Sequence, residues 1–195
     1  MKIRLASPVV MPDSIVDGEG IRFVLWTQGC LHKCPGCQNP QTHSFDDGFL
    51  IDIEEIKEQI DELEGQDGIT FSGGDPFYQV EECIEIAKYV KSKKMNIWCY
   101  TGFTYEVLLS MSKNNPKIIE FLKLIDVLVD GPFILEKKSL DAIFRGSTNQ
   151  RIIDTKLSLK NKSIVLVDKY YTQNKKKSKR DRIYIYSFFC HFSLI

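Results

Sequence analysis

The sequence lacks any apolar run long enough to cross a membrane. Hydrophobic residues make up 43% of its 195 residues, yet no window approaches the ~18 unbroken apolar residues that a span requires. The first residues also lack the features of an export signal, because Pro8 and Pro12 stand where an apolar segment and a small-residue cleavage site would be needed. We therefore expect a globular, cytoplasmic protein with no membrane partner and a single core.

The sequence also lacks net charge. It carries 26 basic and 26 acidic residues, so its electrostatics give no reason to expect a nucleic acid as a partner. Six of the basic residues and one of the acidic residues lie in residues 175–182, which leaves a net charge of −5 on the rest of the chain. We expect one domain over residues 1–170 and a basic and aromatic tail over residues 171–195, whose structure the sequence does not predict.

Cysteine is present six times, but not in the pattern of a disulfide framework. A chain of this length folds on its own core and needs no disulfides, and no export signal points to an oxidising compartment. Cys30, Cys34 and Cys37 crowd into eight residues, whereas the other three cysteines are scattered. The crowding indicates a metal site or redox chemistry.

Hydrophobic periodicity predicts alternating strands and helices. Runs of β-branched and aromatic residues predict strands over residues 21–27, 68–72, 95–100, 125–130 and 163–167. Apolar residues spaced three and four apart predict helices over residues 52–63, 80–90, 105–111 and 117–124. Because the connections are too short for antiparallel rearrangement, the alternation indicates an α/β fold with a parallel sheet or an incomplete barrel. Functional groups in such folds lie at the carboxyl ends of the strands.

Three thiolates on one loop can surround a single inorganic centre, with Pro35 and Gly36 permitting the tight backbone path. A structural zinc site needs four closed ligands, for which His32 and His43 are the nearest further candidates. An iron–sulfur cubane with three protein ligands instead leaves one iron open for a substrate or cofactor. The spacing alone leaves both alternatives open.

Two motifs resemble the signature of radical S-adenosylmethionine enzymes. Cys30-x-x-x-Cys34-x-x-Cys37 follows the predicted strand at residues 21–27. Ser72-Gly73-Gly74-Asp75-Pro76 follows the next predicted strand and resembles the glycine-rich contact to the methionine end of that cofactor. The resemblance implies an α/β fold of the incomplete (β/α) barrel type, with residues 1–170 as the radical S-adenosylmethionine domain.

Further stretches narrow the resemblance to the family that activates anaerobic ribonucleoside-triphosphate reductase by generating a glycyl radical. They are residues 15–22, 28–30, 34–39, 98–102, 128–133 and 145–150, and the last of them, Arg-Gly-Ser-Thr-Asn-Gln, is the most specific. The resemblance covers about residues 8–168. Gly36 stands where the wider superfamily usually has an aromatic residue, and activators of this reductase share that glycine.

The resemblance implies that Cys30, Cys34 and Cys37 hold a 4Fe-4S cluster whose fourth iron chelates S-adenosylmethionine. Reductive cleavage of this cofactor would give a 5′-deoxyadenosyl radical that removes hydrogen from a glycine of the reductase large subunit. A low-potential donor such as flavodoxin would supply the electron, and no catalytic side chain beyond the cluster and cofactor is implied. The implied cofactor contacts are Gly36, Cys37 and Gln38 on the adenine side and Ser72, Gly73, Gly74 and Asp75 on the methionine side.

Other interpretations use the same residues. The chain could activate another glycyl radical enzyme, such as pyruvate formate-lyase, or act on a metabolite, although the block at residues 145–150 argues against both. A zinc-stabilised binding module would use the cysteines without catalysis. Residues 17–20 fit a plain turn as well as a functional loop. Cys83 and Cys99 are expected in the core, and His32 is expected in solvent.

Overall fold

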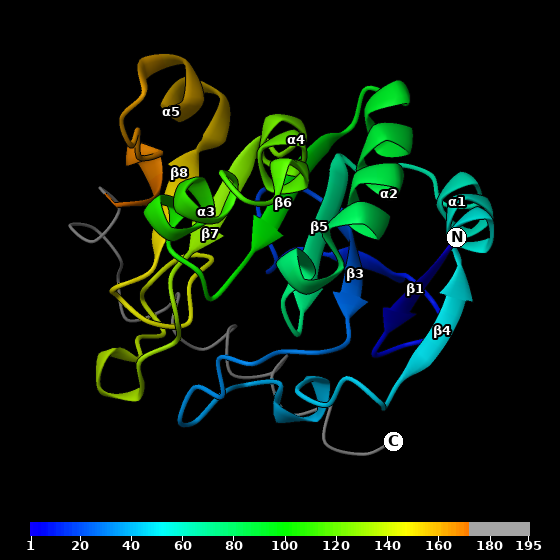
Figure 1. Cartoon of the computed structure of the whole chain (residues 1–195), viewed down its shortest axis with the longest axis horizontal. Helices are drawn as coiled ribbons and strands as arrows, with labels where there is room; N and C mark the ends of the chain where they lie inside the picture. The colour runs from blue at the N-terminus through cyan, green and yellow to red at the C-terminus, as the bar shows by residue number, and fades with distance from the viewer. Residues whose placement is uncertain (172–195) are drawn as a thin grey trace, which may run out of the picture.

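The computed structural model describes residues 1–171, which fold around one sheet of eight strands (Figure 1). Seven strands lie in the order β4-β1-β3-β5-β6-β7-β8, and β2 pairs with β3. The tail expected beyond these residues lies outside the described part of the chain. The strands are β1 (Lys2–Leu5), β2 (Met11–Ser14), β3 (Arg22–Thr27), β4 (Phe49–Asp52), β5 (Gly68–Gly73), β6 (Asn96–Tyr100), β7 (Val127–Asp130) and β8 (Arg151–Asp154).

The centre of the sheet is parallel and its edges are antiparallel. β3, β5, β6 and β7 run parallel to one another. β1 pairs antiparallel with β3 and β4, β2 with β3, and β8 with β7. The prediction of an α/β fold with parallel strands is therefore confirmed for the centre, and the expectation that short connections exclude antiparallel pairing is wrong. Each antiparallel edge strand has only four residues, too few for a clear alternation in the sequence.

Five helices form a single layer over one face of the sheet (Figure 1). α2 contacts α1 and α4, and α4 also contacts α3 and α5. Within residues 1–171, none of the helices combines the length and the apolar character needed to span a membrane. The helices are α1 (Ile53–Asp61), α2 (Val80–Ser92), α3 (Tyr105–Met111), α4 (Pro116–Leu124) and α5 (Thr155–Asn161), with 3-10 turns at Pro40–Thr42, Pro76–Gln79, Leu135–Lys137 and Asp168–Tyr170.

The helices that the sequence predicts all form, and so do four of the five predicted strands. The prediction of a last strand over residues 163–167 is wrong. In that segment Leu166 makes a single isolated bridge to Ile153, and the last strand of the sheet is β8. β8 has the sequence Arg-Ile-Ile-Asp. Its two apolar residues face opposite sides of the sheet and lie between two charged residues, so the sequence shows no apolar alternation that would predict a strand.

The side chains of the central strands alternate between two clusters. On β6, Ile97 and Cys99 point to the helices and join the main core, whereas Trp98 points to the opposite face. There Trp98 packs with Val129 of β7 and Ile152 of β8. The second face is therefore also covered near β6 to β8.

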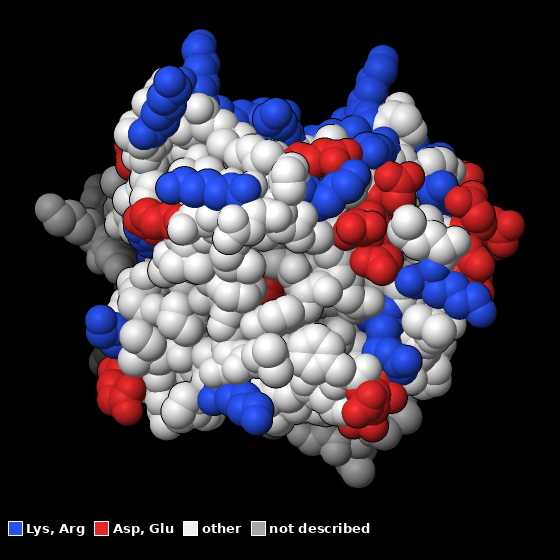
Figure 2. Space-filling model, in the orientation of Figure 1, with Lys and Arg blue, Asp and Glu red and all other residues white. Residues whose placement is uncertain are grey.

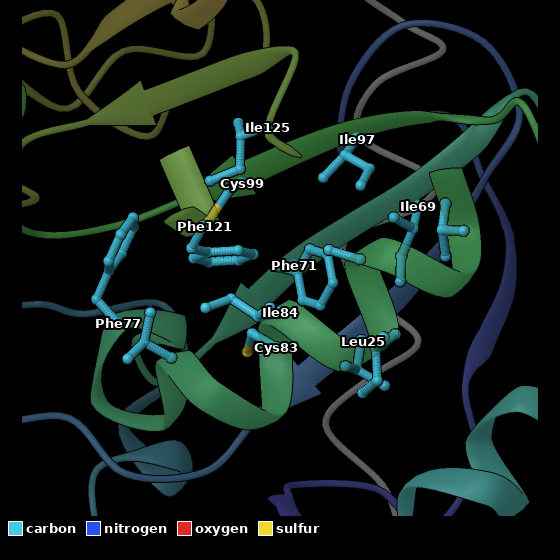
Figure 3. Packing of buried hydrophobic residues seen from close by; sticks show 14 of the residues in the cluster. Leu25, Ile69, Phe71, Phe77, Cys83, Ile84, Ile97, Cys99, Phe121 and Ile125 are labelled. Carbon is cyan, nitrogen blue, oxygen red and sulfur yellow. The ribbon is translucent and has the colours of Figure 1, made fainter. Parts of the chain in front are cut away.

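The main core packs aromatic rings between α2, α4 and the sheet (Figure 3). The Phe121 ring meets the Phe71 ring edge to face, with centroids 5.4 Å apart, and lies 5.3 Å from the Phe77 ring. Cys83 and Cys99 are both fully buried in this core, as predicted. Burial raises the pKa of both thiols well above the ordinary value, so they remain neutral core residues.

Phe121→Ala should lower the free energy of unfolding by about 3–5 kcal/mol, because the substitution removes a fully buried ring and leaves a cavity. Phe49, which is 47% exposed, provides a matched control whose replacement by alanine should change stability by about 0.5 kcal/mol or less. Urea unfolding of the two variants measures both effects. Equal losses would mean that the ring cluster does not stabilise the fold.

Candidate iron–sulfur site

A cavity of about 180 Å³ lies at the carboxyl ends of the parallel strands. Trp26 of β3, Ser72 of β5 and Tyr100 of β6 line it, and Trp26 and Ser72 are register partners. Their sequence neighbours pack in the helix-side core, so the cavity opens on the other face of the sheet. This is the edge at which the sequence predicts the functional groups. Figure 2 shows the helix side of the molecule, where basic and acidic side chains gather toward the top and right and few lie at the centre.

Residues 28–45, here termed the cysteine loop, leave the end of β3 and fold back on themselves. The backbone N–H groups of Gly29 and Cys30 donate to the carbonyls of Thr42 and His43, at 2.8 and 3.0 Å. The Gln28 side chain is 2% exposed, and its Nε2 donates to two carbonyls of the returning segment at 3.0 and 2.9 Å. The loop is therefore closed at its base, and its three thiols face one space.

The three thiols of this loop line the cavity, and a backbone N–H group lies close to each sulfur. The N–H of Asn39 donates to Cys37 Sγ at 3.4 Å, and the N–H groups of His32 and Phe133 act on the pKa of Cys30 and of Cys34. Burial raises the pKa of Cys30 to about 11 and also raises that of Cys34, and the hydrogen bonds oppose both shifts. The free thiols of Cys30 and Cys34 are therefore neutral, and binding of a metal centre must release their protons.

The arrangement of the thiols tests which centre would fit. Within residues 1–171, no three Cys, His, Asp or Glu side chains are placed to hold a single metal ion. Three thiols that line one cavity without converging on a point suit a centre with several metal atoms, in which each thiolate binds its own iron. The three thiols around one cavity therefore fit an iron–sulfur cluster.

Gly73 and Gly74 line the cavity next to the cysteine loop. Gly73 has a φ of +99°, a conformation that favours glycine. A Cβ on Gly74 would lie 2.4 Å from the Gly29 carbonyl oxygen. The sequence predicts that these glycines lack side chains so that the cofactor can approach, but the structure adds a reason within the protein: the β5 end and the start of the cysteine loop touch backbone to backbone.

Asp75 and His32 lie differently from the sequence prediction. Asp75 is fully buried, and its carboxylate accepts hydrogen bonds from His32, Phe77, Thr101 and Gly102. It does not belong to the cavity lining. The expectation that His32 is solvated is wrong, because its side chain is 17% exposed and its Nε2 donates to Asp75 Oδ2 at 2.7 Å.

The block at residues 145–150 forms another wall of the cavity. Gln150 Oε1 accepts hydrogen bonds from the backbone of Gly146 and Ser147, at 2.9 and 3.1 Å, and its Nε2 donates to the Gly131 carbonyl at 3.1 Å. Asn149 Nδ2 donates to the Pro132 carbonyl at 2.8 Å. The polar side chains of this block thus join it to residues 131–133, whose Phe133 lines the same cavity.

Most of the predicted site residues meet at this cavity. Gly36 does not line it, and the space for its Cβ is taken by Leu135. Asp17 lies in the wall, although its stretch of sequence fits a plain turn equally well; its Oδ2 accepts a hydrogen bond from Ser14 Oγ at 2.5 Å. Burial raises the pKa of Asp17, and this hydrogen bond and the Arg22 charge oppose the rise. The predicted residues in the lining are Cys30, Cys34, Cys37, Gln38, Ser72, Gly73 and Gly74.

Comparison with known proteins agrees with this geometry. A family model described as a 4Fe-4S single cluster domain matches residues 16–153. The anaerobic ribonucleoside-triphosphate reductase-activating protein of Enterobacteria phage T4 is 36% identical over 151 residues, which cover 73% of this chain and 90% of the phage protein. The chain belongs to this family of activating proteins.

Other members of the activating-protein family match over similar lengths. The Haemophilus influenzae protein of the same name is 35% identical over 154 residues, which cover 75% of this chain and 96% of that protein. The Escherichia coli protein is 34% identical over 147 residues, covering 71% and 92%. The stretch matched by the 4Fe-4S model spans the cysteine loop, both cavity glycines and the wall block, which together build the cavity.

Gly74→Ala should lower both the stability of this activating-protein fold and its iron content, because the new Cβ would meet the Gly29 carbonyl and displace the start of the cysteine loop. We expect a loss of about 1–3 kcal/mol, measured by urea unfolding, together with less iron and sulfide bound after anaerobic reconstitution. Gly65→Ala serves as the control for iron binding: its Cβ would meet nothing within 4 Å, so it should bind iron normally, although its φ of +90° strains an alanine and lowers stability there as well. If Gly74→Ala has wild-type stability and binds wild-type amounts of iron, the close contact between Gly74 and the Gly29 carbonyl does not constrain the site.

Proposed function

We propose that the chain is a radical S-adenosylmethionine activase that generates a glycyl radical on the large subunit of anaerobic ribonucleoside-triphosphate reductase. In this proposal Cys30, Cys34 and Cys37 hold a 4Fe-4S cluster. When bound, the cluster supplies the electron that splits the sulfonium S–C bond of S-adenosylmethionine. The observation that carries the proposal is the single cavity at the ends of β3, β5 and β6 that the three thiols and the Gly73-Gly74 backbone share.

The residues of the chain bind and orient the cofactor. We assign Ser72, Gly73 and Gly74 to its methionine end, because their backbone lines the cavity next to the thiols. We assign Gly36, Cys37 and Gln38 to its adenine side; Cys37 and Gln38 line the cavity, and Gly36 sets the loop path with a φ of +71°. Phe133 and Gln150 line another side of the cavity.

The partner and electron donor follow from the same proposal. The relatives are named as activating proteins of the reductase, so we propose its large subunit as partner and a low-potential protein such as flavodoxin as donor, both in the cytoplasm. Leu31 in the cysteine loop and Leu135 beside Gly36 are 61% and 47% exposed. Apolar side chains at this edge suit contact with another protein.

We also propose that the parallel strands β3, β5, β6 and β7 are the core of an incomplete (β/α) barrel, and that residues 1–170 form the radical S-adenosylmethionine domain. Tyr170 supports a domain end near this point, because it is 8% exposed and packs on Trp98 and Phe144. Tyr171 belongs with the same body: its hydroxyl accepts a hydrogen bond from the Ile152 backbone at 2.7 Å, and its ring lies 4.3 Å from the Arg145 guanidinium.

Replacing Cys30, Cys34 or Cys37 with alanine should abolish cluster binding and S-adenosylmethionine cleavage, because each thiolate is proposed to hold one iron. Iron and sulfide content and the methionine and 5′-deoxyadenosine released under reducing, anaerobic conditions measure the two losses. Cys83→Ala and Cys99→Ala are the matched controls in the buried core and should keep the cluster. Full activity in any loop variant would refute the ligand assignment.

The reaction itself is tested by anaerobic incubation of the chain with S-adenosylmethionine, a reductant and the reductase. Electron paramagnetic resonance should then show a glycyl radical on the partner. A brown protein with labile sulfide that yields no such signal would limit the chain to cofactor cleavage. A colourless protein with bound zinc would contradict the proposal and would indicate that the chain is a zinc-stabilised binding module.

Truncation after Tyr171 should leave S-adenosylmethionine cleavage unchanged, because every proposed site residue lies earlier in the chain and Tyr171 keeps its contacts. The control is truncation after Lys169, which also removes the buried Tyr170 ring and should cost about 3–5 kcal/mol of stability. Product release and urea unfolding measure the two variants. Loss of cleavage in a folded, iron-loaded 1–171 protein would show that the tail helps to build the site.

A further inference from the structure

Asp75 joins three segments of the chain through one buried carboxylate. Its Oδ2 accepts hydrogen bonds from His32 Nε2 at 2.7 Å, from Thr101 Oγ1 at 2.8 Å and from the Gly102 backbone N–H at 3.0 Å. Its Oδ1 accepts the Phe77 N–H at 3.0 Å. Asp75 is 0% exposed. A carboxylate removed from water in this way is tolerated only when it is hydrogen-bonded, so these donors satisfy it.

The His32 ring occupies a fitted slot at the ends of β5 and β6. Its centroid lies 4.5 Å from that of Phe103 in an edge-on arrangement and 6.0 Å from that of Tyr78. A Cβ on Gly102 would lie 2.4 Å from the ring, so the glycine makes room for the histidine. The cysteine loop is thus attached to the body at His32 as well as at its closed base.

His32 lies midway between Cys30 and Cys34, and its backbone contacts one of the proposed iron ligands. The His32 N–H lies on the side of the Cys30 sulfur and opposes the rise in the pKa of that thiol. An N–H is correctly placed only if its backbone is held still. The His32 side chain restrains the backbone of residue 32, because its ring is hydrogen-bonded to the buried Asp75 carboxylate.

We propose that His32 and Asp75 are a positioning pair, in which the buried carboxylate holds the histidine ring and thereby holds the cysteine loop and the N–H group directed at the Cys30 sulfur. Asp75 then acts on the loop and not on the methionine end of the cofactor. The part of this inference that concerns the cluster rests on the proposed function. The contacts themselves belong to the chain without a cluster, so they can be tested in the metal-free protein.

The first test compares His32→Phe with His32→Gln in the metal-free protein. Phenylalanine keeps a ring in the slot and removes the donor, whereas the glutamine amide places a donor near the position of Nε2. We expect His32→Phe to increase the alkylation rate of Cys30 by about tenfold to a hundredfold, the change in an opening equilibrium on losing a hydrogen bond to a charged group. His32→Gln should stay close to wild type. Peptide mapping separates the thiols, including Cys190 outside the described residues.

Cys83 and Cys99 report on the rest of the fold in the same experiment, because both are fully buried. They should stay unlabelled in every variant. Lys33→Gln is the loop control, since Lys33 is an exposed neighbour of His32, and it should label as wild type. Unchanged labelling of Cys30 in His32→Phe would overturn the proposal. Labelling of Cys83 and Cys99 along with Cys30 would also overturn it, because the pair would then support the whole domain and not the loop.

The second test measures the midpoint potential of the reconstituted cluster by electron paramagnetic resonance. Hydrogen bonds to the ligand sulfurs raise the reduction potential of such clusters by stabilising the added electron. His32→Phe should therefore shift the potential to a more negative value, and His32→Gln should restore it. An unchanged potential in His32→Phe would show that the pair does not position the His32 N–H at the Cys30 sulfur. If wild type binds no cluster, the proposed function fails, while the labelling result still decides whether the pair holds the loop.

Discussion

The contact between the end of β5 and the start of the cysteine loop is the constraint on which the site depends. The Gly74 N–H donates to the Thr27 carbonyl at 2.7 Å, and the Asp75 N–H donates to the Gly29 carbonyl at 3.0 Å. These bonds continue the parallel pairing of β3 and β5 beyond the last residue of each strand. They hold two loops together with no side chain between them, which places thiols and open backbone in one cavity.

The two faces of the sheet have different roles, because one packs in the core and the other lines the cavity. Side chains that face the helices form the main core, and those at the carboxyl ends on the other face line the cavity. Because alternate residues of one strand serve the two faces, Phe71 can be buried among aromatic rings while Ser72 lines the site. The antiparallel edge strands extend the sheet on both sides of the parallel centre without contributing to this cavity edge.

The sequence predicts the elements with strong periodicity and the site motifs with distinctive spacing. The central strands, the helices and the three cysteines carry these signals. β1, β2, β4 and β8 do not, because four residues are too few to show a period of two, and β8 also has a charged residue at each end. His32 and Asp75 illustrate a different limit. Each reads as a polar loop residue, and only the fold brings together two side chains that lie 43 positions apart.

The three sulfur atoms of the cavity receive their N–H groups from different parts of the chain. Two donors, His32 and Asn39, belong to the cysteine loop itself. The third, Phe133, follows β7 and is held by the polar side chains of the block that precedes β8. A nascent chain that has emerged only as far as α4 therefore presents the complete set of thiols but not the complete set of donors. The surroundings of Cys34 are therefore complete only when the segment that follows β7 has packed against the cysteine loop.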